Sequence, residues 1–544
     1  MNKIFEYYVK NIQDERILKQ LKRMTDGDID NNFSGYLSFG TAGMRGEMEQ
    51  GTNKLNELTV AKLAQSVAIY LKQNVQNQTV TICFDTRHNS KKFSRIFAKV
   101  LEKNSIKVYL FKNFAPTPLC VFATRILSAS FGVMITASHN NKKYNGIKIY
   151  DTHGIQIDKS VQQKISQIFE KVDEIQVYND IFQQKLTKNI IFLGKEYEKL
   201  YVLGKKSRIN KTLKIVYTPL NGTGYFCVKR LLKNNKYKFS TPQCQKFGNG
   251  NFTTCPYPNP EFVEAFSQSI KKAKHKNADI IVATDPDADR LGVMVKHKGE
   301  YVKLSGNEVG YIFADYILKR NFDKNKFVVT SVVSSPLIDK ICDSYNAKVY
   351  KTLTGFLSLG TKARELTQTY GENAFALCFE ESCGYVVRKN VFDKDGIFAT
   401  LKICDIANEK KKQGDTLIDY LDDIYEKVGY ISSQSDSIMF IGKDSLKRMN
   451  DFVDNLRKNS PSEVCGYKII EVVDYQESKK TGLDKQNFLQ FKAGELEFII
   501  RPSGTEPKLK IYLFLTGKDK DATGKQAREI LDNIKKYINE KSKN

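Results

Sequence analysis

Apolar residues recur along this chain with two spacings, which predict alternating helices and strands. Between 60 and 71 they follow the i, i+3, i+4, i+7 order of an amphipathic helix, with Val60, Leu63, Ala64, Val67, Ala68 and Leu71 on one side. Short β-branched or apolar runs that end in polar or Gly/Pro-rich loops predict strands at 79–84, 131–135, 213–217, 279–284 and 327–333. Ligands of α/β proteins bind beyond the carboxyl ends of such strands, so we expect a functional site in these loops.

The remaining patterns describe the middle and the end of the chain. Residues 233–260 are rich in Asn, Gly, Thr and Pro and predict a long surface connection. After about Asp423 a smaller α+β pattern begins, and it ends in an amphipathic helix with Ala527, Ile530, Leu531, Ile534, Tyr537 and Ile538 on one face. The length of 544 residues suggests three or four domains. We therefore expect three α/β units followed by a terminal α+β unit.

Composition narrows the class of protein. With 41% hydrophobic and 27% charged residues and 12 prolines, the chain is an ordinary globular protein and neither disordered nor fibrous. A net charge of +25 favours anionic partners such as phosphates, nucleic acid or membrane surfaces. The ten cysteines include no C-x-x-C pair, so we expect reduced, mostly buried thiols. The N-terminal segment lacks a signal peptide, and no apolar run approaches the ~20 residues of a membrane span, which predicts a cytoplasmic protein.

The sharpest motif is Asp285-Pro286-Asp287-Ala288-Asp289-Arg290, directly after the predicted strand at 279–284. Three carboxylates at alternate positions repel one another unless a cation lies between them. Hard oxygen ligands at this density suit Mg²⁺, whereas the Gly and the terminal Glu of an EF-hand calcium loop are missing. The motif therefore predicts a magnesium site.

Five further segments add polar and cationic groups. In Thr136-Ala137-Ser138-His139-Asn140 a serine stands at the end of a strand next to a histidine that could polarise a reacting oxygen. Residues 501–508 (R-P-S-G-T-E-P-K) and 39–46 (F-G-T-A-G-M-R-G) combine Arg with Gly or hydroxyl groups, which suits a phosphate. Residues 379–385 (F-E-E-S-C-G-Y) and 393–396 (D-K-D-G) offer groups that bind sugar hydroxyls or a phosphate. Each loop has a structural interpretation when taken alone, but the set indicates a small substrate with phosphate at either of two ends.

Together, these motifs resemble those of the α-D-phosphohexomutase family. Within it they are similar to the branch of phosphoglucomutases, phosphomannomutases and phosphopentomutases that has an F-G-T-A-G-x-R-G loop. The resemblance runs from about Phe39 to Lys510, with its four main motifs in the family's order. It implies four domains around a central cleft, three of related α/β architecture and a smaller C-terminal α+β domain. We expect a phosphoserine-loop domain, a metal-binding domain, a sugar-recognition domain and a phosphate-binding domain at 1–205, 206–312, 313–425 and 426–544.

The resemblance also implies roles for the matching residues. Ser138 is expected to be the phosphoserine and to hold Mg²⁺ together with Asp285, Asp287 and Asp289, while Arg290 supports the same centre. The residues expected to contact the substrate are Glu380 and Ser382 on sugar hydroxyls, Thr354 and Gly355 in the loop that orients the sugar, and Arg501, Ser503, Gly504 and Thr505 on the non-reacting phosphate. Arg45, His139 and Lys394 are candidates for stabilising the moving phosphoryl group or for acid/base chemistry, and their ranking stays open.

One position departs from the family pattern. Members commonly have proline after Ser-His-Asn, whereas this chain has Asn141. The change removes a ring that restricts φ but no ligand side chain, so we expect activity to remain.

The expected reaction interconverts a sugar 1-phosphate and a sugar 6-phosphate through the phosphoserine and a sugar bisphosphate. Glucose phosphates are the first expected substrate and mannose phosphates the second, with Mg²⁺ as cofactor and glucose 1,6-bisphosphate, or the matching sugar bisphosphate, as activator. A phosphopentomutase acting on ribose or deoxyribose phosphates is the alternative. The expected partners are small sugar phosphates, and we expect binding to neither nucleic acid nor membranes. The protein is expected to be a monomer or a homodimer.

Two other classes of protein share single features with this chain. Phosphatases of the haloacid-dehalogenase kind have the D-x-D spacing of Asp285 and Asp287. That assignment would leave the loops of Ser138 and Arg501 without a role. A non-catalytic binding protein for sugar phosphates or nucleic acid would suit the charge of +25, but no helix-turn-helix, finger or aromatic RNA-binding motif is evident.

Overall fold

The computed structural model describes residues 2–40, 43–187, 189–204, 211–442, 444–503 and 507–541. The chain divides into two compact units, each built from more than one segment. The first unit comprises Met1–Gly306, Gly355–Glu365 and Ser382–Thr416, and the second comprises Asn307–Thr354, Leu366–Glu381 and Leu417–Asn544.

The first sheet of the first unit has seven strands in the order β1-β2-β6-β5-β3-β4-β7. Their bounds are β1 (Phe39–Gly40), β2 (Gly43–Glu47), β3 (Thr79–Phe84), β4 (Lys107–Phe111), β5 (Phe131–Ile135), β6 (Tyr144–Asp151) and β7 (Ile190–Leu193). Strands β5, β3, β4 and β7 run parallel to one another, whereas the pairs β5/β6, β6/β2 and β2/β1 are antiparallel. The carboxyl ends of β3 and β5 therefore meet at one edge, where the loops of Asp85 and Ser138 begin.

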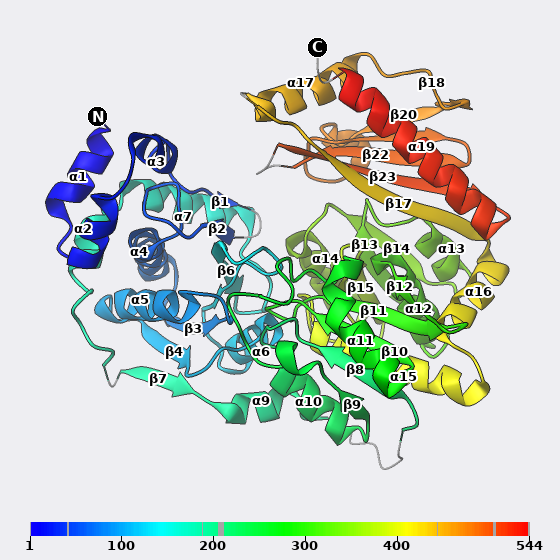
Figure 1. Ribbon diagram of the computed structural model, residues 1–544, viewed down its shortest axis with the longest axis horizontal. Coiled ribbons are helices and arrows are strands. Elements are labelled where there is room, and N and C mark those ends of the chain that lie inside the picture. Colours follow the sequence, from blue (N-terminus) through cyan, green and yellow to red (C-terminus); the bar gives the residue numbers. More distant parts are fainter. Residues whose placement is uncertain are drawn as a thin grey trace. The chain divides into compact units, whose positions relative to one another are not determined.

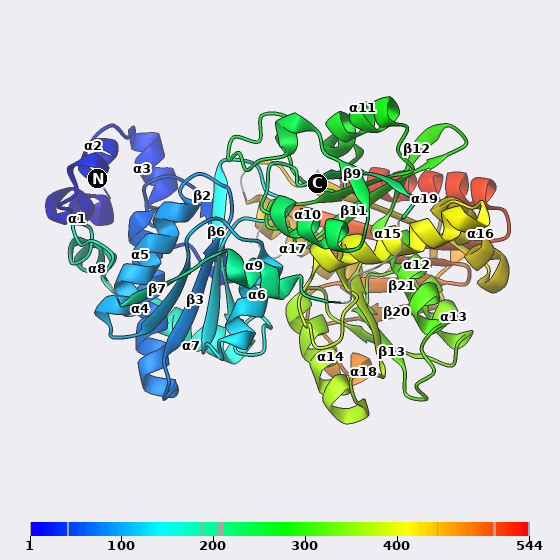
Figure 2. The same cartoon turned by 90° about the horizontal axis from the view of Figure 1, so that it is seen from below.

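Nine helices of the described chain accompany this sheet: α1 (Lys3–Asn11), α2 (Glu15–Leu21), α3 (Asp26–Asn32), α4 (Glu57–Asn74), α5 (Ser90–Lys103), α6 (Thr117–Ile126), α7 (Lys159–Lys171), α8 (Glu174–Asn179) and α9 (Lys195–Tyr201). Figure 2 shows α4 and α5 side by side, and α4 also packs against α7 and α8. The sequence predicts one apolar face for α4, but most of its residues are buried, because these helices cover it on several sides. Lys62 is buried with them and pairs with Glu174 at 2.7 Å.

The second sheet of the first unit has five strands in the order β12-β11-β10-β8-β9. The elements of this part are β8 (Lys214–Thr218), β9 (Lys238–Ser240), β10 (Ile280–Thr284), β11 (Leu291–His297), β12 (Glu300–Leu304), α10 (Tyr225–Asn234), α11 (Ser267–Lys276), α15 (Gly396–Gln413), and the 3₁₀ turns η1 (Gln243–Gln245) and η2 (Val263–Phe266). Strands β8, β9 and β10 are parallel, and β10 is followed by the antiparallel β11. The aspartate motif forms the short turn between β10 and β11.

The prediction that residues 233–260 form a surface connection is wrong in part. It contains β9, which pairs with β8 and extends the sheet, and the side chains of Tyr237, Phe252 and Cys255 within it are buried. The three residues of β9 are too few to show an alternating pattern. Their backbone is stabilised by pairing with β8, which composition does not reveal.

The second unit has a parallel sheet and an antiparallel one. The elements of its first part are β13 (Phe327–Ser331), β14 (Lys348–Thr352), β15 (Phe375–Glu380), α12 (Gly306–Leu318), α13 (Leu337–Asp343), α14 (Phe356–Tyr370) and α16 (Leu417–Val428). Strand β13 lies between β14 and β15 and is parallel to both. Strand β16 (Gly384–Val386), the first residue of α12 and residues 356–365 of α14, which are most of that helix, belong to the first unit.

The terminal part is an antiparallel sheet in the order β17-β23-β22-β21-β20. Its elements are β17 (Tyr430–Met439), β20 (Glu471–Asp474), β21 (Leu489–Ala493), β22 (Leu496–Pro502), β23 (Lys508–Gly517), α17 (Ser445–Lys458), α18 (Ser478–Thr481), α19 (Lys520–Lys541), and the small pair β18 (Glu463–Val464) and β19 (Tyr467–Lys468). Figure 1 shows α19 lying along this sheet, where it contacts β17 and β23. The predicted apolar positions from Ala527 to Ile538 are buried apart from Tyr537, so this helix seals one face of the sheet.

The predicted fold class is confirmed. Strands β3 and β5 coincide with their predicted ranges, β8 and β10 differ by one residue at their ends, and β13 ends at Ser331 because the chain turns there. Eight of the ten cysteines are buried, and all ten are free thiols. None of the described helices has both the length and the apolar character that crossing a bilayer requires.

Candidate active site

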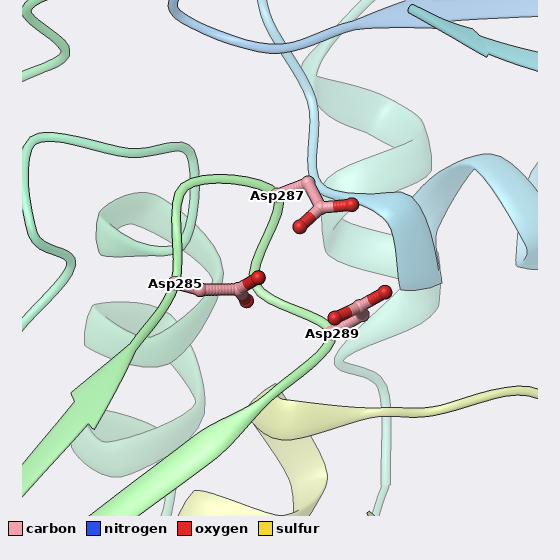
Figure 3. Close-up of side chains that lie close together, drawn as sticks. All are labelled: Asp285, Asp287 and Asp289. Atoms are coloured by element: carbon pink, nitrogen blue, oxygen red, sulfur yellow. The ribbon is translucent and has the colours of Figure 1, made fainter. Parts of the chain in front are cut away.

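Three carboxylates gather in the turn between β10 and β11. Asp285, Asp287 and Asp289 are buried, and one ligand oxygen from each lies within 4.8 Å of the others. Figure 3 shows the three side chains around one loop, with Asp285 facing the other two. The alternate spacing points all three toward the same space because the loop curves around it.

The backbone of this turn is held by neighbouring loops of the first unit. Thr117 donates its backbone N–H to the carbonyl oxygen of Asp287 at 2.8 Å, and Thr223 donates its N–H to that of Pro286 at 2.8 Å. At Gly222 an added Cβ would lie 2.3 Å from the Pro286 Cα, so only glycine permits this approach. Ala288 has a positive φ of 57°, which is sparsely populated for a residue with a Cβ. The surrounding contacts therefore determine the shape of the turn.

Ser138 follows β5 and reaches the aspartate turn. Its Oγ donates a hydrogen bond to Asp285 Oδ2 at 2.7 Å and lies 3.3 Å from His139 Nδ1. Its own φ is 52°, again in the left-handed region, and its backbone N–H donates to Thr136 Oγ1 at 2.8 Å. Backbone strain in a buried serine is typical of a functional site.

Arg87 holds the serine loop through hydrogen bonds to its backbone. Its guanidinium donates to the carbonyl oxygens of Ser138 and Asn140, each at 2.5 Å, and to those of Asn141 at 2.7 Å and Tyr144 at 3.1 Å. Asp85 Oδ2 lies 3.2 Å from Arg87 Nε, and both side chains are fully buried. One planar donor group thus ties four carbonyl oxygens of a single loop together, which a lysine could not do.

Four cationic side chains surround the carboxylates. Lys148, on β6, places Nζ 2.7 Å from Asp287 Oδ2 and 2.9 Å from Asp289 Oδ2. Lys394 lies 3.5 Å from Asp289 Oδ2. Arg45 donates to Asn140 Oδ1 at 2.9 Å, and Arg290 pairs with Glu261 while its backbone N–H donates to Asp285 Oδ1 at 3.0 Å. The predicted residues Arg45, His139, Arg290 and Lys394 therefore lie around the same centre as Ser138.

Burial and neighbouring charges shift the pKa of Asp285, Asp287 and His139, raising the first and lowering the other two. Burial, followed by the charges of Asp287 and Asp289, raises the pKa of Asp285 well above its ordinary value. Burial also acts to raise the pKa of Asp287, but the charge and hydrogen bond of Lys148 outweigh it and lower that pKa. Burial lowers the pKa of His139 well below its ordinary value, and the charges of Arg290 and Arg45 add to this effect. The imidazole is therefore neutral at neutral pH.

The carboxylates fit a divalent cation. Asp287 Oδ1 and Asp289 Oδ1 are buried, and neither has a hydrogen-bond partner in the described part of the chain. A buried carboxylate oxygen without a partner is costly, and a hard cation would satisfy both. The carboxylate of Asp285 and the hydroxyl of Ser138, which hydrogen-bond to each other at 2.7 Å, would offer such a cation further oxygen ligands.

The other predicted site residues divide between the two units. Thr354, Glu380, Arg501 and Ser503 belong to the second unit, whereas Gly355 and Ser382 belong to the first. Gly504 and Thr505 lie outside the described residues, as do Thr41 and Ala42 of the first glycine loop. In the second unit, Thr354 Oγ1 and Arg501 Nε are buried and have no hydrogen-bond partner among the described residues, which leaves both available to a ligand.

Sequence reasoning missed Lys148, Arg87 and Thr117. A lysine between two isoleucines in the strand Gly146-Ile147-Lys148-Ile149 is a signal, because a charge in an apolar strand needs a buried partner. Asp85-x-Arg87 directly after β3 is another, since it lies at a strand end beside that of β5. Thr117 Oγ1 donates to Asp287 Oδ2 at 2.8 Å, and nothing in its local sequence marks this contact.

Comparisons with known proteins agree with this architecture. Three family models match, described as phosphoglucomutase/phosphomannomutase, alpha/beta/alpha domains I, II and III, over residues 36–176, 197–299 and 305–428. A phosphoglucomutase of Staphylococcus haemolyticus is 34% identical over 501 residues, which cover 89% of this chain and 91% of that protein. The chain belongs to the α-D-phosphohexomutase family. It is therefore a mutase of the phosphoglucomutase/phosphomannomutase type, an intramolecular phosphotransferase.

Solved structures show the same fold. The phosphoglucomutase parafusin of Paramecium superposes with a TM-score of 0.69 at 17% identity, covering 93% of this chain and 95% of that one. An N-acetylphosphoglucosamine mutase of Aspergillus fumigatus, described in complex with GlcNAc-6P and magnesium, gives a TM-score of 0.52 at 12% identity and covers 96% of this chain and 98% of that one. The expectation of three α/β domains and a C-terminal domain of this family is confirmed.

Proposed function

We propose that the protein interconverts glucose 1-phosphate and glucose 6-phosphate through a phosphoserine at Ser138. The observation that carries the proposal is the hydrogen bond of 2.7 Å from Ser138 Oγ to Asp285, next to two buried carboxylate oxygens that have no partner in the described chain. A serine that faces a cation site and is surrounded by cationic side chains suits a phosphoryl carrier, since a phosphoserine adds a charge of about −1.5 to −2 at neutral pH.

The proposed reaction has two transfers. The free hydroxyl oxygen of the sugar monophosphate attacks the phosphorus on Ser138 and gives up its proton. The bond between Oγ and phosphorus breaks, its electron pair stays on Oγ, and Oγ takes up a proton. The resulting sugar bisphosphate turns around, and the Ser138 hydroxyl loses its proton and attacks the phosphorus at the other end. The bond between that phosphorus and its sugar oxygen breaks, the electron pair stays on the sugar oxygen, which takes up a proton, and the phosphoserine is restored. The net change is movement of the phosphate between two positions of the sugar.

The residues of the first unit support this chemistry by position and charge. Asp285, Asp287, Asp289 and the oxygen of Ser138 would hold Mg²⁺, which supplies positive charge to the transferring phosphoryl group. Lys148 and Arg290 keep the carboxylates and the serine oxygen in place through the contacts described above. Arg45, His139 and Lys394 remain the candidates for stabilising the phosphoryl group and for proton transfer at the sugar hydroxyl.

The remaining predicted residues bind the substrate in this proposal. Glu380 and Ser382 bind sugar hydroxyls, Thr354 and Gly355 set the orientation of the sugar, and the non-reacting phosphate is held by Arg501, Ser503, Gly504 and Thr505. We place the domains at 1–205, 206–312, 313–425 and 426–544. Mannose phosphates are the second candidate substrate, and pentose phosphates the third.

A coupled assay tests the proposal. Conversion of glucose 1-phosphate to glucose 6-phosphate is followed with Mg²⁺, with and without glucose 1,6-bisphosphate, while inorganic phosphate is recorded in parallel. We expect conversion that is activated by the bisphosphate and releases little phosphate. Phosphate release without isomer would instead indicate a sugar phosphatase. Turnover of ribose or mannose phosphates alone would reassign the substrate.

A further inference from the structure

A second polar cavity of the first unit lies along α5 and the segment that follows α8. Its volume is about 710 Å³, within the range of small-ligand sites. Its lining includes no Asp or Glu but seven cationic side chains: Arg16, Arg87, Lys91, Lys92, Arg95, Lys99 and Lys185. Of the residues that hold the loop of Ser138, Arg87 alone is shared with this lining.

The charges on α5 are arranged unfavourably for an isolated helix. Lys91, Arg95 and Lys99 follow one another at i, i+4 and i+8, so they lie in one row on the helix surface. Like charges at i, i+4 repel one another and destabilise the helix. Lys99 is half-buried, and its pKa is lowered by burial and by the charge of Arg95. An anion beside this row would remove the repulsion.

Neighbouring lysines on the same helix have carboxylate partners. Lys103 lies 2.5 Å from Asp180, and Lys92 pairs with Glu57. By contrast, no carboxylate of the described residues lies within ion-pair distance of Lys91, Arg95 or Lys185. Among the charges that line the cavity, Arg16, Arg87 and Lys92 have carboxylate partners, whereas Lys91, Arg95 and Lys185 have none in the described chain.

Another part of the lining is aromatic and aliphatic. Tyr178 and Phe182 are stacked with ring centroids 6.0 Å apart and an interplanar angle of 26°, and Phe182 is half-buried. Ile96 and Leu186 lie in the same lining. A planar apolar group fits against such a surface, while several negative charges fit against the row on α5. Concavity favours a small ligand over a membrane or a nucleic-acid strand.

We propose that this cavity binds a soluble oligophosphate, with the phosphate chain on Lys91, Arg95 and Lys185. The shared chemistry is a chain of three or more phosphate charges, and two sources supply it: a nucleoside triphosphate or an inorganic polyphosphate. A nucleoside triphosphate would in addition place its base near Phe182. If a nucleoside triphosphate is the natural ligand, it should therefore bind more tightly than tripolyphosphate.

Isothermal titration calorimetry of the full chain with ATP and with inorganic tripolyphosphate tests the proposal. The buffer contains no divalent cation, and glucose 6-phosphate is present at saturation to occupy the catalytic centre. We expect both probes to bind, and both to bind more weakly as salt increases. The double variant K91E/R95E should weaken binding by about tenfold or more, because each change replaces an attraction with a repulsion.

A matched control distinguishes binding at this cavity from attraction by the net charge of the whole protein. Lys271 and Lys274 are exposed on α11, so K271E/K274E changes the net charge equally and should leave binding unchanged. Thermal unfolding checks that each variant is folded. The proposal would be overturned if both double variants lost the same amount of affinity for the probes. It would also be overturned if glucose 6-phosphate displaced the probes, or if neither probe bound at millimolar concentration. Binding to vesicles rich in phosphatidylserine, with no binding of either soluble probe, would overturn it in favour of a membrane surface.

Discussion

The hydroxyl of Ser138 and the carboxylate of Asp285 meet at 2.7 Å although 147 positions separate them in the chain. The contact joins the carboxyl end of β5 in the first sheet to that of β10 in the second, and both sheets belong to the first unit. In the proposed function, the phosphoryl acceptor and one ligand of the cation therefore share a hydrogen bond. This relationship makes several outcomes measurable.

Ser138→Ala should abolish turnover. Removing the oxygen that carries the phosphoryl group should lower kcat by about 10³-fold or more, because no other hydroxyl replaces it. The thermal midpoint should stay close to that of the wild type, since a small side chain replaces a small one. Kinetics and thermal unfolding, compared with Ser267→Ala at an exposed position of α11, check this. Near-normal turnover in Ser138→Ala would refute the phosphoserine assignment.

Removal of Mg²⁺ by a chelator should stop turnover reversibly, and Asp287→Asn should raise the Mg²⁺ concentration needed by about 10–100-fold. The reason is that Asp287 Oδ1 is buried without a hydrogen-bond partner in the described chain. Mg²⁺ should also raise the thermal midpoint of the wild type, because it binds only the folded state, and do so less for the variant. An unchanged midpoint in both proteins would show that no cation binds the triad.

Arg87→Lys should reduce kcat more than it changes KM. The variant keeps the charge beside Asp85 but cannot donate to four carbonyl oxygens, so the serine loop loses its support. Buried donors and acceptors left without partners should lower the free energy of unfolding by about 2–4 kcal/mol. Urea unfolding and kinetics measure both effects, with Arg528→Lys on the exposed side of α19 as control. A change in KM alone would contradict this role.

Asn141→Pro should remain active, with kcat within about twofold of the wild type. Asn141 is not among the residues with positive φ, and the described chain offers its backbone N–H no hydrogen-bond acceptor, so the proline ring removes no bond. Its carbonyl oxygen still accepts from Arg87, while the turn bond from the Lys143 N–H to Asn141 Oδ1 is lost. A thermal midpoint equal to or above that of the wild type is expected. Loss of activity would show that the asparagine side chain has a role of its own.

Arg501→Ala should raise KM by about tenfold or more and change kcat little, if Arg501 holds the phosphate that does not react. Arg501 lies at the end of β22, and its Nε is buried with no partner among the described residues. Steady-state kinetics over a range of glucose 1-phosphate concentrations separate the two parameters. Unchanged KM would remove Arg501 from the substrate site.

Local patterns were enough to predict the class of fold and the aspartate turn. Period-two and period-3.6 apolar spacing reflects which face of a strand or helix is buried, so β3, β5 and α4 could be located from the sequence. Asp285, Asp287 and Asp289 are close in the chain, and their mutual repulsion alone indicates a cation. The short strand β9 escaped prediction because its stability comes from pairing with β8.

Contacts between distant segments depend on strand order and packing, which no local pattern encodes. Lys148 reaches Asp287 across 139 positions, and Arg87 reaches the carbonyl of Ser138 across 51. In a sequence, each is a single charged residue in or after a strand. A buried charge is stable only where an opposite charge or an acceptor meets it, and where that happens is known only once the sheets have packed.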